Sequence, residues 1–321
     1  MTLHPADRLA FDKAMVTQPV WNRFNTARDA VNLDENILLH AGPAFSNPSK
    51  ITLPILNSAC VAAVFEGLAK NFDEAEAMIL ASEIILKPSQ DHDVVTPLAA
   101  VVSASMPLHT VYDAWGGQQR VYAPINAGSR PAMRLGLRSE AVLEHIRWLN
   151  TRFLDVLEDG LAEGIALVPL AVIGLAGGDD CHGRTPVAHA ALVNELKDRT
   201  LHAITDENVL QFMATSPSLF LNLWMAATKC MMKLAEGVEG SSFITAAGGN
   251  GREIGIQISG LPGQWFTVAA SAPKGKFDVD LPEDRSLGAI GDSAVVEAFG
   301  LGAMVIELSP EQKKLLSAYL P

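Results

Sequence analysis

Segments with helical periodicity and segments with strand periodicity are mixed irregularly along this 321-residue chain, which limits the folds open to it. Residues 139–159 carry apolar side chains at steps of three or four, which predicts a helix capped by Ser139. Isoleucines alternate with other residues at 254–258, and a Gly-Leu-Pro-Gly turn then leads into an extended run at 265–268, which predicts a β-hairpin. Because no steady βαβ rhythm connects these segments, we expect an α+β fold, a mixed α/β assembly of several subdomains rather than a doubly wound sheet.

The same patterns divide the chain into three parts. We expect an α/β subdomain at 1–125, a mainly helical subdomain at 126–238 and an α/β subdomain containing the hairpin at 239–321. The further elements expected are helices at 72–86, 186–198, 217–235 and 311–319, and extended segments at 37–40 and 101–104.

Composition excludes several classes of protein. The chain has 24 Lys+Arg and 36 Asp+Glu, a net charge of −12, which argues against nucleic acid and anionic membranes as partners. The longest apolar run, 165–176, contains Pro169 and is shorter than the about 20 residues that span a bilayer. The three cysteines form no CxxC pair and the first residues show no signal pattern, so we expect a cytoplasmic protein.

Familiar cofactor and catalytic motifs are missing from the sequence. It contains no GxGxxG, GxxxxGK[ST], GxSxG or HExxH pattern. The chain is therefore expected to be neither a Rossmann nor a P-loop protein, and no cofactor is expected.

The loop at 177–186 is the strongest candidate site. Two glycines precede Asp179, Asp180, His182 and Arg184, a set that can hold an anionic substrate and move protons. An ordinary capping loop, with Asp180 or Thr185 capping the next helix, is the structural alternative. A metal site made of Asp179, Asp180 and His182 also stays open, although the spacing matches no recognised metal motif, so we expect no metal.

Five weaker candidates lie elsewhere in the chain. They are Asn250 after a glycine-rich loop, Ser293 in Gly291-Asp292-Ser293-Ala294, Ser105 after an extended run, His40 at a strand end and Glu66 after an apolar run. Each has a structural alternative, such as a turn, a helix cap or a solvated helix end.

Arginine is unevenly distributed. Six arginines but only two acids, Glu140 and Glu144, fall between 120 and 152, so this window carries 6 − 2 = +4 within an acidic chain. The window is either the solvated basic face of a helix or an anion site, in which Arg134 would bind carboxylate or phosphate.

Eight short segments then occur in an order that resembles one family. The series resembles the YlbE/YahG-like family, long described as a domain of unknown function, and covers about residues 37–303. The matching segments are 39–43, 59–67, 103–107 (Ser-Ala-Ser-Met-Pro), 178–184 (Gly-Asp-Asp-Cys-His-Gly-Arg), 220–223, 250–260, 265–267 and 291–294.

The resemblance implies a fold and a reaction. The fold implied is several α/β subdomains with a small helical bundle. The family includes an AllG-type subunit linked to oxamate carbamoyltransferase in anaerobic allantoin breakdown, which implies an FdrA-type partner and transfer of a carbamoyl group between phosphate and an amide nitrogen. The substrates implied are small anions, namely carbamoyl phosphate and an oxamate-like or oxalurate-like carboxylate.

Residue type and motif suggest a role for each candidate residue. His182 would be the acid/base, oriented by Asp179 or Asp180, and Arg184 and Arg134 would hold the anion. Asn250, Ser105 and Ser293 would donate hydrogen bonds, with His40 and Glu66 also at the binding site. A non-catalytic assembly subunit and a metal-dependent amidohydrolase are the alternatives, and a homo-oligomer is compatible with the sequence.

The chain departs from the family pattern in two places. Thr96-Pro97-Leu98-Ala99-Ala100 stands where a Gly-Pro-Met-x-Gly stretch is expected, so a backbone approach to a ligand would change. The chain is also expected to end earlier than its relatives, without the C-terminal part of the family domain.

Overall fold

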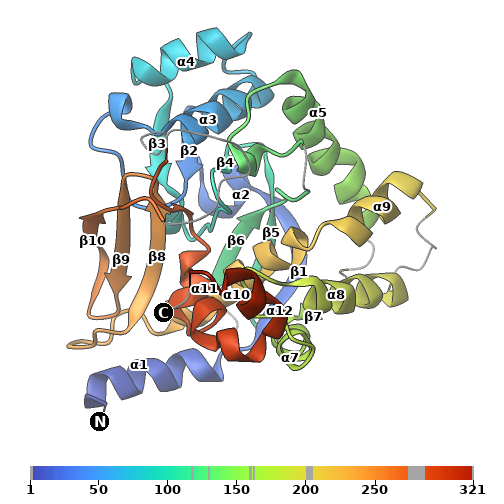
Figure 1. The fold of residues 1–321 in the computed structure, drawn as a ribbon. Coiled ribbons are helices and arrows are strands. Elements are labelled where there is room, and N and C mark those ends of the chain that lie inside the picture. The colour runs from blue at the N-terminus through green and yellow to red at the C-terminus, as the bar shows by residue number, and fades with distance from the viewer. Residues whose placement is uncertain are drawn as a thin grey trace.

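Three small sheets and a set of helices make up the fold (Figure 1). The computed structural model describes residues 3–116, 119–128, 131–158, 161, 163–199, 205–273 and 286–319. The mixture of helices with parallel and antiparallel strand pairs confirms the α+β prediction.

Two of the sheets have four strands and are antiparallel. The first has the order β6 (Arg120–Pro124), β5 (Pro107–Asp113), β1 (Pro19–Thr26), β7 (Ile165–Ala166). The second has the order β10 (Leu261–Ala269), β9 (Glu253–Ile258), β8 (Ile244–Asn250), β11 (Ile290–Gly291). The antiparallel pairing of β9 with β10 confirms the predicted hairpin.

The third sheet is smaller and mixed. Its order is β3 (Ile85–Pro88), β2 (Ile37–His40), β4 (Val101–Val102), with β2 and β3 parallel and β2 and β4 antiparallel. Both predicted extended segments are therefore present, although the second is limited to two residues.

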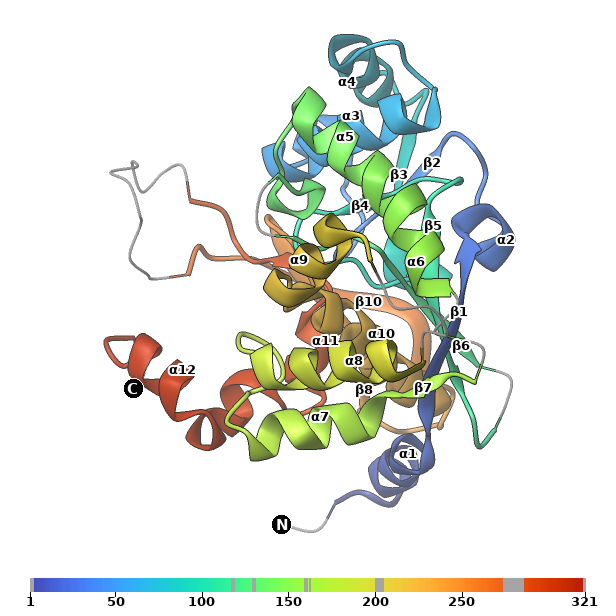
Figure 2. The same ribbon diagram turned by 90° about the vertical axis from the view of Figure 1, so that its right-hand side faces the viewer.

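The helices surround these sheets. Figure 2 shows α3, α4 and α5 at one end of the molecule and α7, α8 and α12 at the other. The described helices are α1 (Pro5–Val16), α2 (Ala27–Val31), α3 (Leu53–Glu66), α4 (Phe72–Leu80), α5 (Glu140–Trp148), α6 (Leu154–Glu158), α7 (Leu167–Ala176), α8 (Pro186–Arg199), α9 (Glu207–Thr215), α10 (Ser218–Leu234), α11 (Ala294–Ala298) and α12 (Pro310–Leu316).

Helix α10 is the central element of the fold. It is buried over most of its length and contacts β5 and β6 of one sheet, β8 of another, and helices α1, α7, α8 and α11. One hydrophobic core runs from Trp21 to Val296 and includes residues of all three proposed subdomains. The three boundaries therefore remain a prediction.

The five helices predicted from local sequence signals begin within one residue of their expected starts. The Ser139 hydroxyl accepts the Val142 N–H at the start of α5, and the predicted helix continues through a π-helical turn at Leu149–Phe153 into α6. The predicted helices at 186–198 and 217–235 are α8 and α10. The helix expected at 311–319 is α12.

The helix predicted over 72–86 is wrong at its C-terminal end. Asn71 caps it as expected, but α4 ends at Leu80, and Ser82 then has a φ of 62°. Residues Ile85–Pro88 form β3 instead, because their backbone pairs with β2. Apolar periodicity could not show this, since the pairing depends on a strand about 50 positions away.

Helix α7 is the apolar run identified in the sequence. It spans Leu167–Ala176, and no helix in the described part of the chain has the length and apolarity needed to cross a membrane.

A buried histidine makes the fold sensitive to acid. The His109 ring lies 5.0 Å from the Trp21 and Phe24 rings, measured between centroids, and its two nitrogens have no hydrogen-bond partner in the described structure. Burial lowers the pKa of His109 from 6.5 to about 3. Below pH 6.5 the unfolded chain therefore binds a proton that the folded chain does not bind. The free energy of unfolding consequently decreases as the pH is lowered from 6.5 to about 3.

We expect His109→Phe to remove this contribution. As the pH is lowered from about 6 to 4, the unfolding free energy of both proteins is measured by urea titration. The slope for the variant should be smaller than that for the wild type, and the difference between the slopes should be about 1.4 kcal/mol per pH unit. Equal slopes for the two proteins would contradict the assignment.

Candidate functional site

The loop between α7 and α8 is fixed by its own two aspartates. The carboxylate of Asp179 accepts the N–H groups of Val187 and Ala188 at 2.9 and 2.8 Å and so caps α8. Asp180 accepts the N–H groups of His182 and Arg184, both at 2.8 Å. Burial raises the pKa of Asp179 even though these hydrogen bonds act to lower it. One oxygen of each carboxylate thus shapes the loop, while the buried Oδ1 of Asp179 has no hydrogen-bond partner among the described residues.

His182 is paired with a glutamate far along the chain. Its Nδ1 lies 2.5 Å from Oε1 of Glu297 in α11, and the two side chains are 24% and 34% exposed. Burial acts to raise the pKa of Glu297, but the His182 contacts and the Ala303 N–H outweigh it, so the pKa lies below its usual value. A carboxylate at Nδ1 fixes the ring and leaves Nε2 as the atom available for proton transfer.

The partner of His182 differs from the expectation. Asp179 or Asp180 was expected to orient the ring, but both bind backbone N–H groups, and Glu297 holds it instead. One signal could have pointed to Glu297, because it follows the Gly291-Asp292-Ser293 segment closely in sequence.

Arg184 follows His182 by two residues in the same loop. Its backbone is held by Asp180, its side chain is half-buried, and its guanidinium makes no ion pair within the described chain. Its positive charge acts on Asp179. The loop therefore carries an oriented imidazole and, two residues further on, a guanidinium whose charge acts on Asp179 without a direct ion pair in the described chain.

Asp292 is the hub of a second group of residues. This fully buried carboxylate accepts five hydrogen bonds, from Gly42 N–H, Ser89 Oγ, Gln90 Nε2, and the N–H and Oγ1 of Thr96, at 2.5–3.0 Å. Burial raises the pKa of Asp292, while these donors act to lower it. The sequence indicated a helix cap or an anion-binding helix N-terminus at this position, so the buried hub was missed.

Three predicted binding residues lie around this hub. Asn250 donates to the Pro43 carbonyl, accepts the Arg252 and Glu253 N–H groups, and is fully buried. His40 is buried with Nδ1 at the Ala41 carbonyl, and burial lowers its pKa to about 4. Ser293 immediately precedes α11, which connects Asp292 to Glu297.

Close backbone packing at the hub requires glycine. Gly42 has a φ of +76°, and a Cβ there would lie 2.4 Å from the Gly249 carbonyl carbon and 2.6 Å from the Asn250 nitrogen. The glycine-free segment at 96–100 also contains a residue with a positive φ, because Leu98 adopts a φ of 47°. Leu98 packs closely against Gly291, where an added Cβ would lie 2.9 Å from the Leu98 nitrogen.

Gly42→Ala is expected to destabilise the protein more than Gly67→Ala. Gly67 has a similar φ of +80°, but nothing lies within 4 Å of a Cβ built there, so its replacement costs only about 1–2 kcal/mol of backbone strain. Gly42→Ala should add about 1–3 kcal/mol of overpacking, measured by urea unfolding of both variants. Equal losses would contradict the close approach.

Ser105 and Glu66 form a separate pair. The Glu66 carboxylate accepts the N–H and the hydroxyl of Ser105 and lies 3.8 Å from an Arg28 nitrogen. The structure thus brings these two predicted residues together, but no contact joins them to the His182 loop in the described chain.

The arginine window does not form one anion site. Arg138 pairs with Glu76 and Arg152 with Asp206, acids that lie outside the window in sequence. Arg134 donates to the Gly128 carbonyl at 2.7 and 3.2 Å, and burial lowers its pKa. Arg130 lies outside the described residues. The fold therefore pairs two of the six arginines with acids from outside the window.

The described residues contain no group of three or more His, Cys, Asp or Glu side chains placed to hold a metal ion. Asp179 and Asp180 bind backbone N–H groups, and the carboxylate that contacts His182 is that of Glu297.

The fold and site define an α+β protein with a half-buried His182–Glu297 pair in which the histidine shares its loop with Arg184. A family model described as "Oxamate carbamoyltransferase subunit AllG" matches residues 84–293, and the chain belongs to this family. This range includes the His182 loop and Asp292.

Two curated relatives come from Escherichia coli K12. The chain is 32% identical to the uncharacterised protein YahG over 95% of its own length and 66% of YahG, and 30% identical to the oxamate carbamoyltransferase subunit AllG over 98% of its length and 76% of AllG. It thus spans about two thirds of YahG and three quarters of AllG. A crystal structure of a conserved protein of unknown function from Enterococcus faecalis V583 superposes with a TM-score of 0.88 and 26% identity over 95% of this chain and 74% of that one.

Proposed function

We propose that this chain is a catalytic subunit of a carbamoyltransferase that acts on a small ureido or amide carboxylate. The observation that carries the proposal is the His182–Glu297 pair, which orients an imidazole two residues away from Arg184, an arginine without an ion pair in the described chain. Membership in the AllG family supports the reaction class.

The proposed reaction divides into two proton-coupled steps. A phosphate oxygen attacks the ureido carbonyl carbon of oxalurate, and the C–N bond to the oxamate nitrogen then breaks, which yields carbamoyl phosphate and oxamate. The departing nitrogen needs a proton, and His182 Nε2 would supply the one that the phosphate gives up. Arg184 would hold the substrate carboxylate or the phosphate through its forked N–H groups.

The test is a reconstitution with an FdrA-type partner subunit. The complete complex should form carbamoyl phosphate from oxalurate and phosphate, while each subunit alone should form little. If the assembled complex forms no carbamoyl phosphate, the proposed substrates are contradicted.

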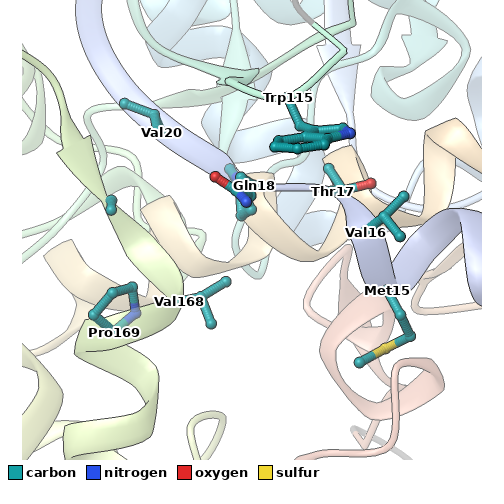
Figure 3. Close-up of a pocket in the computed structure, with 10 residues that line it drawn as sticks. Met15, Val16, Thr17, Gln18, Val20, Trp115, Val168 and Pro169 are labelled. Atoms are coloured by element: carbon teal, nitrogen blue, oxygen red, sulfur yellow. The ribbon is translucent and has the colours of Figure 1, made fainter.

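A second candidate, an assembly subunit without catalytic groups, is favoured by one apolar groove. The groove has a volume of about 570 Å³ and lies between the end of α1, Trp115 and the start of α7 (Figure 3). Trp115 is 75% exposed, and Val172 and Ile173 on α7 are also exposed. If this role is correct, Trp115→Ser should weaken capture of the partner, and His182→Gln should leave the activity of the complex unchanged.

A further inference from the structure

A polar cleft borders the turn that carries Ser89 and Gln90 of the Asp292 hub, but its lining includes no residue of the His182 loop and no residue of the hub. Its volume is about 580 Å³. It is lined by Val31 at the end of α2, Asn32, the segment Asp91–Asp93, Arg120 and Tyr122 of β6, and Lys233 of α10. Four segments that are distant in sequence therefore converge on one concave surface. The proposed carbamoyl transfer uses none of these residues.

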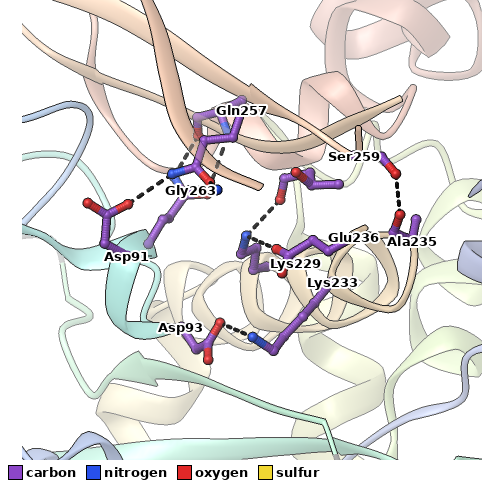
Figure 4. A network of polar contacts seen from close by, with 12 residues as sticks. Asp91, Asp93, Lys229, Lys233, Ala235, Glu236, Gln257, Ser259 and Gly263 are labelled. Carbon is purple, nitrogen blue, oxygen red and sulfur yellow. Dashed lines mark hydrogen bonds and ion pairs between the residues drawn. The ribbon is translucent and has the colours of Figure 1, made fainter. Parts of the chain in front are cut away.

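One pair of charges at the cleft is already neutralised. Lys233 Nζ lies 2.5 Å from Oδ1 of Asp93 (Figure 4). The nearby Lys229 is buried and bound to Glu236 and to the Thr245 carbonyl, so it adds no free cation to the cleft.

Two further charges have no partner of opposite sign within the described chain. Asp91 accepts hydrogen bonds from Gln257 Nε2 at 2.9 Å and Trp265 Nε1 at 2.8 Å, which are both neutral donors. Arg120 is exposed and makes no ion pair with a described acid. Burial lowers the pKa of His92 and raises that of Tyr122, so both are uncharged near pH 7. The cleft thus presents one unmatched carboxylate and one unmatched guanidinium.

We propose that this cleft binds a small zwitterion of the α-amino acid type, with its ammonium group at Asp91 and its carboxylate at Arg120. A guanidinium matches a carboxylate with two parallel hydrogen bonds, and the aspartate offers its remaining lone pairs to an ammonium group. Ala30 and Val31 provide an apolar wall for a short aliphatic side chain. A simple anion would be repelled by Asp91, and a simple cation by Arg120, so the charge pattern favours a ligand that carries both groups.

Calorimetric titration of the full chain with the individual protein amino acids tests the proposal. At least one with a small side chain should bind saturably below about 10 mM, and acetate and methylammonium should each bind at least about tenfold more weakly. Asp91→Asn keeps the acceptor for Gln257 and Trp265 but removes the charge, and Arg120→Gln removes the guanidinium. Each should weaken binding by about tenfold or more.

Matched controls lie outside the cleft. Asp34→Asn and Arg147→Gln make the same changes at exposed positions and should leave binding unchanged. Circular dichroism checks that each variant is folded. If Asp91→Asn does not fold, the binding measured for Arg120→Gln alone tests the proposal. The proposal is overturned if no amino acid binds, if acetate binds as tightly as the best amino acid, or if Arg120→Gln binds like the wild type.

Discussion

Asp292→Ala should lower the free energy of unfolding by about 3–5 kcal/mol, more than any other single substitution considered for this chain. The carboxylate receives five hydrogen bonds in a fully buried position, so its loss leaves the Gly42 and Thr96 N–H groups without their acceptor and removes one hydrogen bond from each of three side chains. These donors belong to Gly42, Ser89, Gln90 and Thr96, which follow or flank the third sheet, while Asp292 follows the last strand of the second. The substitution should therefore loosen the junction of the two sheets.

Urea unfolding followed by circular dichroism measures this loss. Asp34→Ala is the matched control, because Asp34 is exposed, and its stability should stay within about 0.5 kcal/mol of the wild type. A loss below about 1 kcal/mol for Asp292→Ala would show that the hydrogen-bonded junction contributes little.

Much of the local structure could be predicted because its cause is local. The Ser139 cap, the apolar spacing through Phe153 and the Gly-Leu-Pro-Gly turn of the hairpin all act within a few residues. Patterns of this kind fix which segments become helices and hairpins. They carry no information on which elements pack together, so the parallel pairing of β3 with β2 was missed.

The candidate site was only half predictable for the same reason. His182 and Arg184 could be singled out because they share one glycine-flanked loop. Glu297 is 115 positions from His182, and the donors to Asp292 are 196–250 positions from it, so only the folded chain brings them together. Charge counting failed at the arginine window, because Glu76 and Asp206, which neutralise two of its arginines, lie outside it.

His182→Gln should reduce kcat/KM of the reconstituted complex by about 10²–10⁴-fold, the range typical for loss of a general acid–base group. Glutamine keeps a polar side chain that can still contact Glu297 but cannot transfer a proton at neutral pH. Glu297→Gln should cause a smaller loss, because the imidazole remains and only its orienting charge is removed. His4→Gln, at the exposed start of α1, is the control and should leave the rate unchanged.

The most direct measurement is the rate of carbamoyl phosphate formation from oxalurate and phosphate by equal amounts of assembled wild-type and His182→Gln complex. Equal assembly is checked by gel filtration before the assay. If His182 transfers the proton, the variant complex forms carbamoyl phosphate at no more than about one hundredth of the wild-type rate. A variant complex that assembles normally and turns over at the wild-type rate would contradict the catalytic role of this chain.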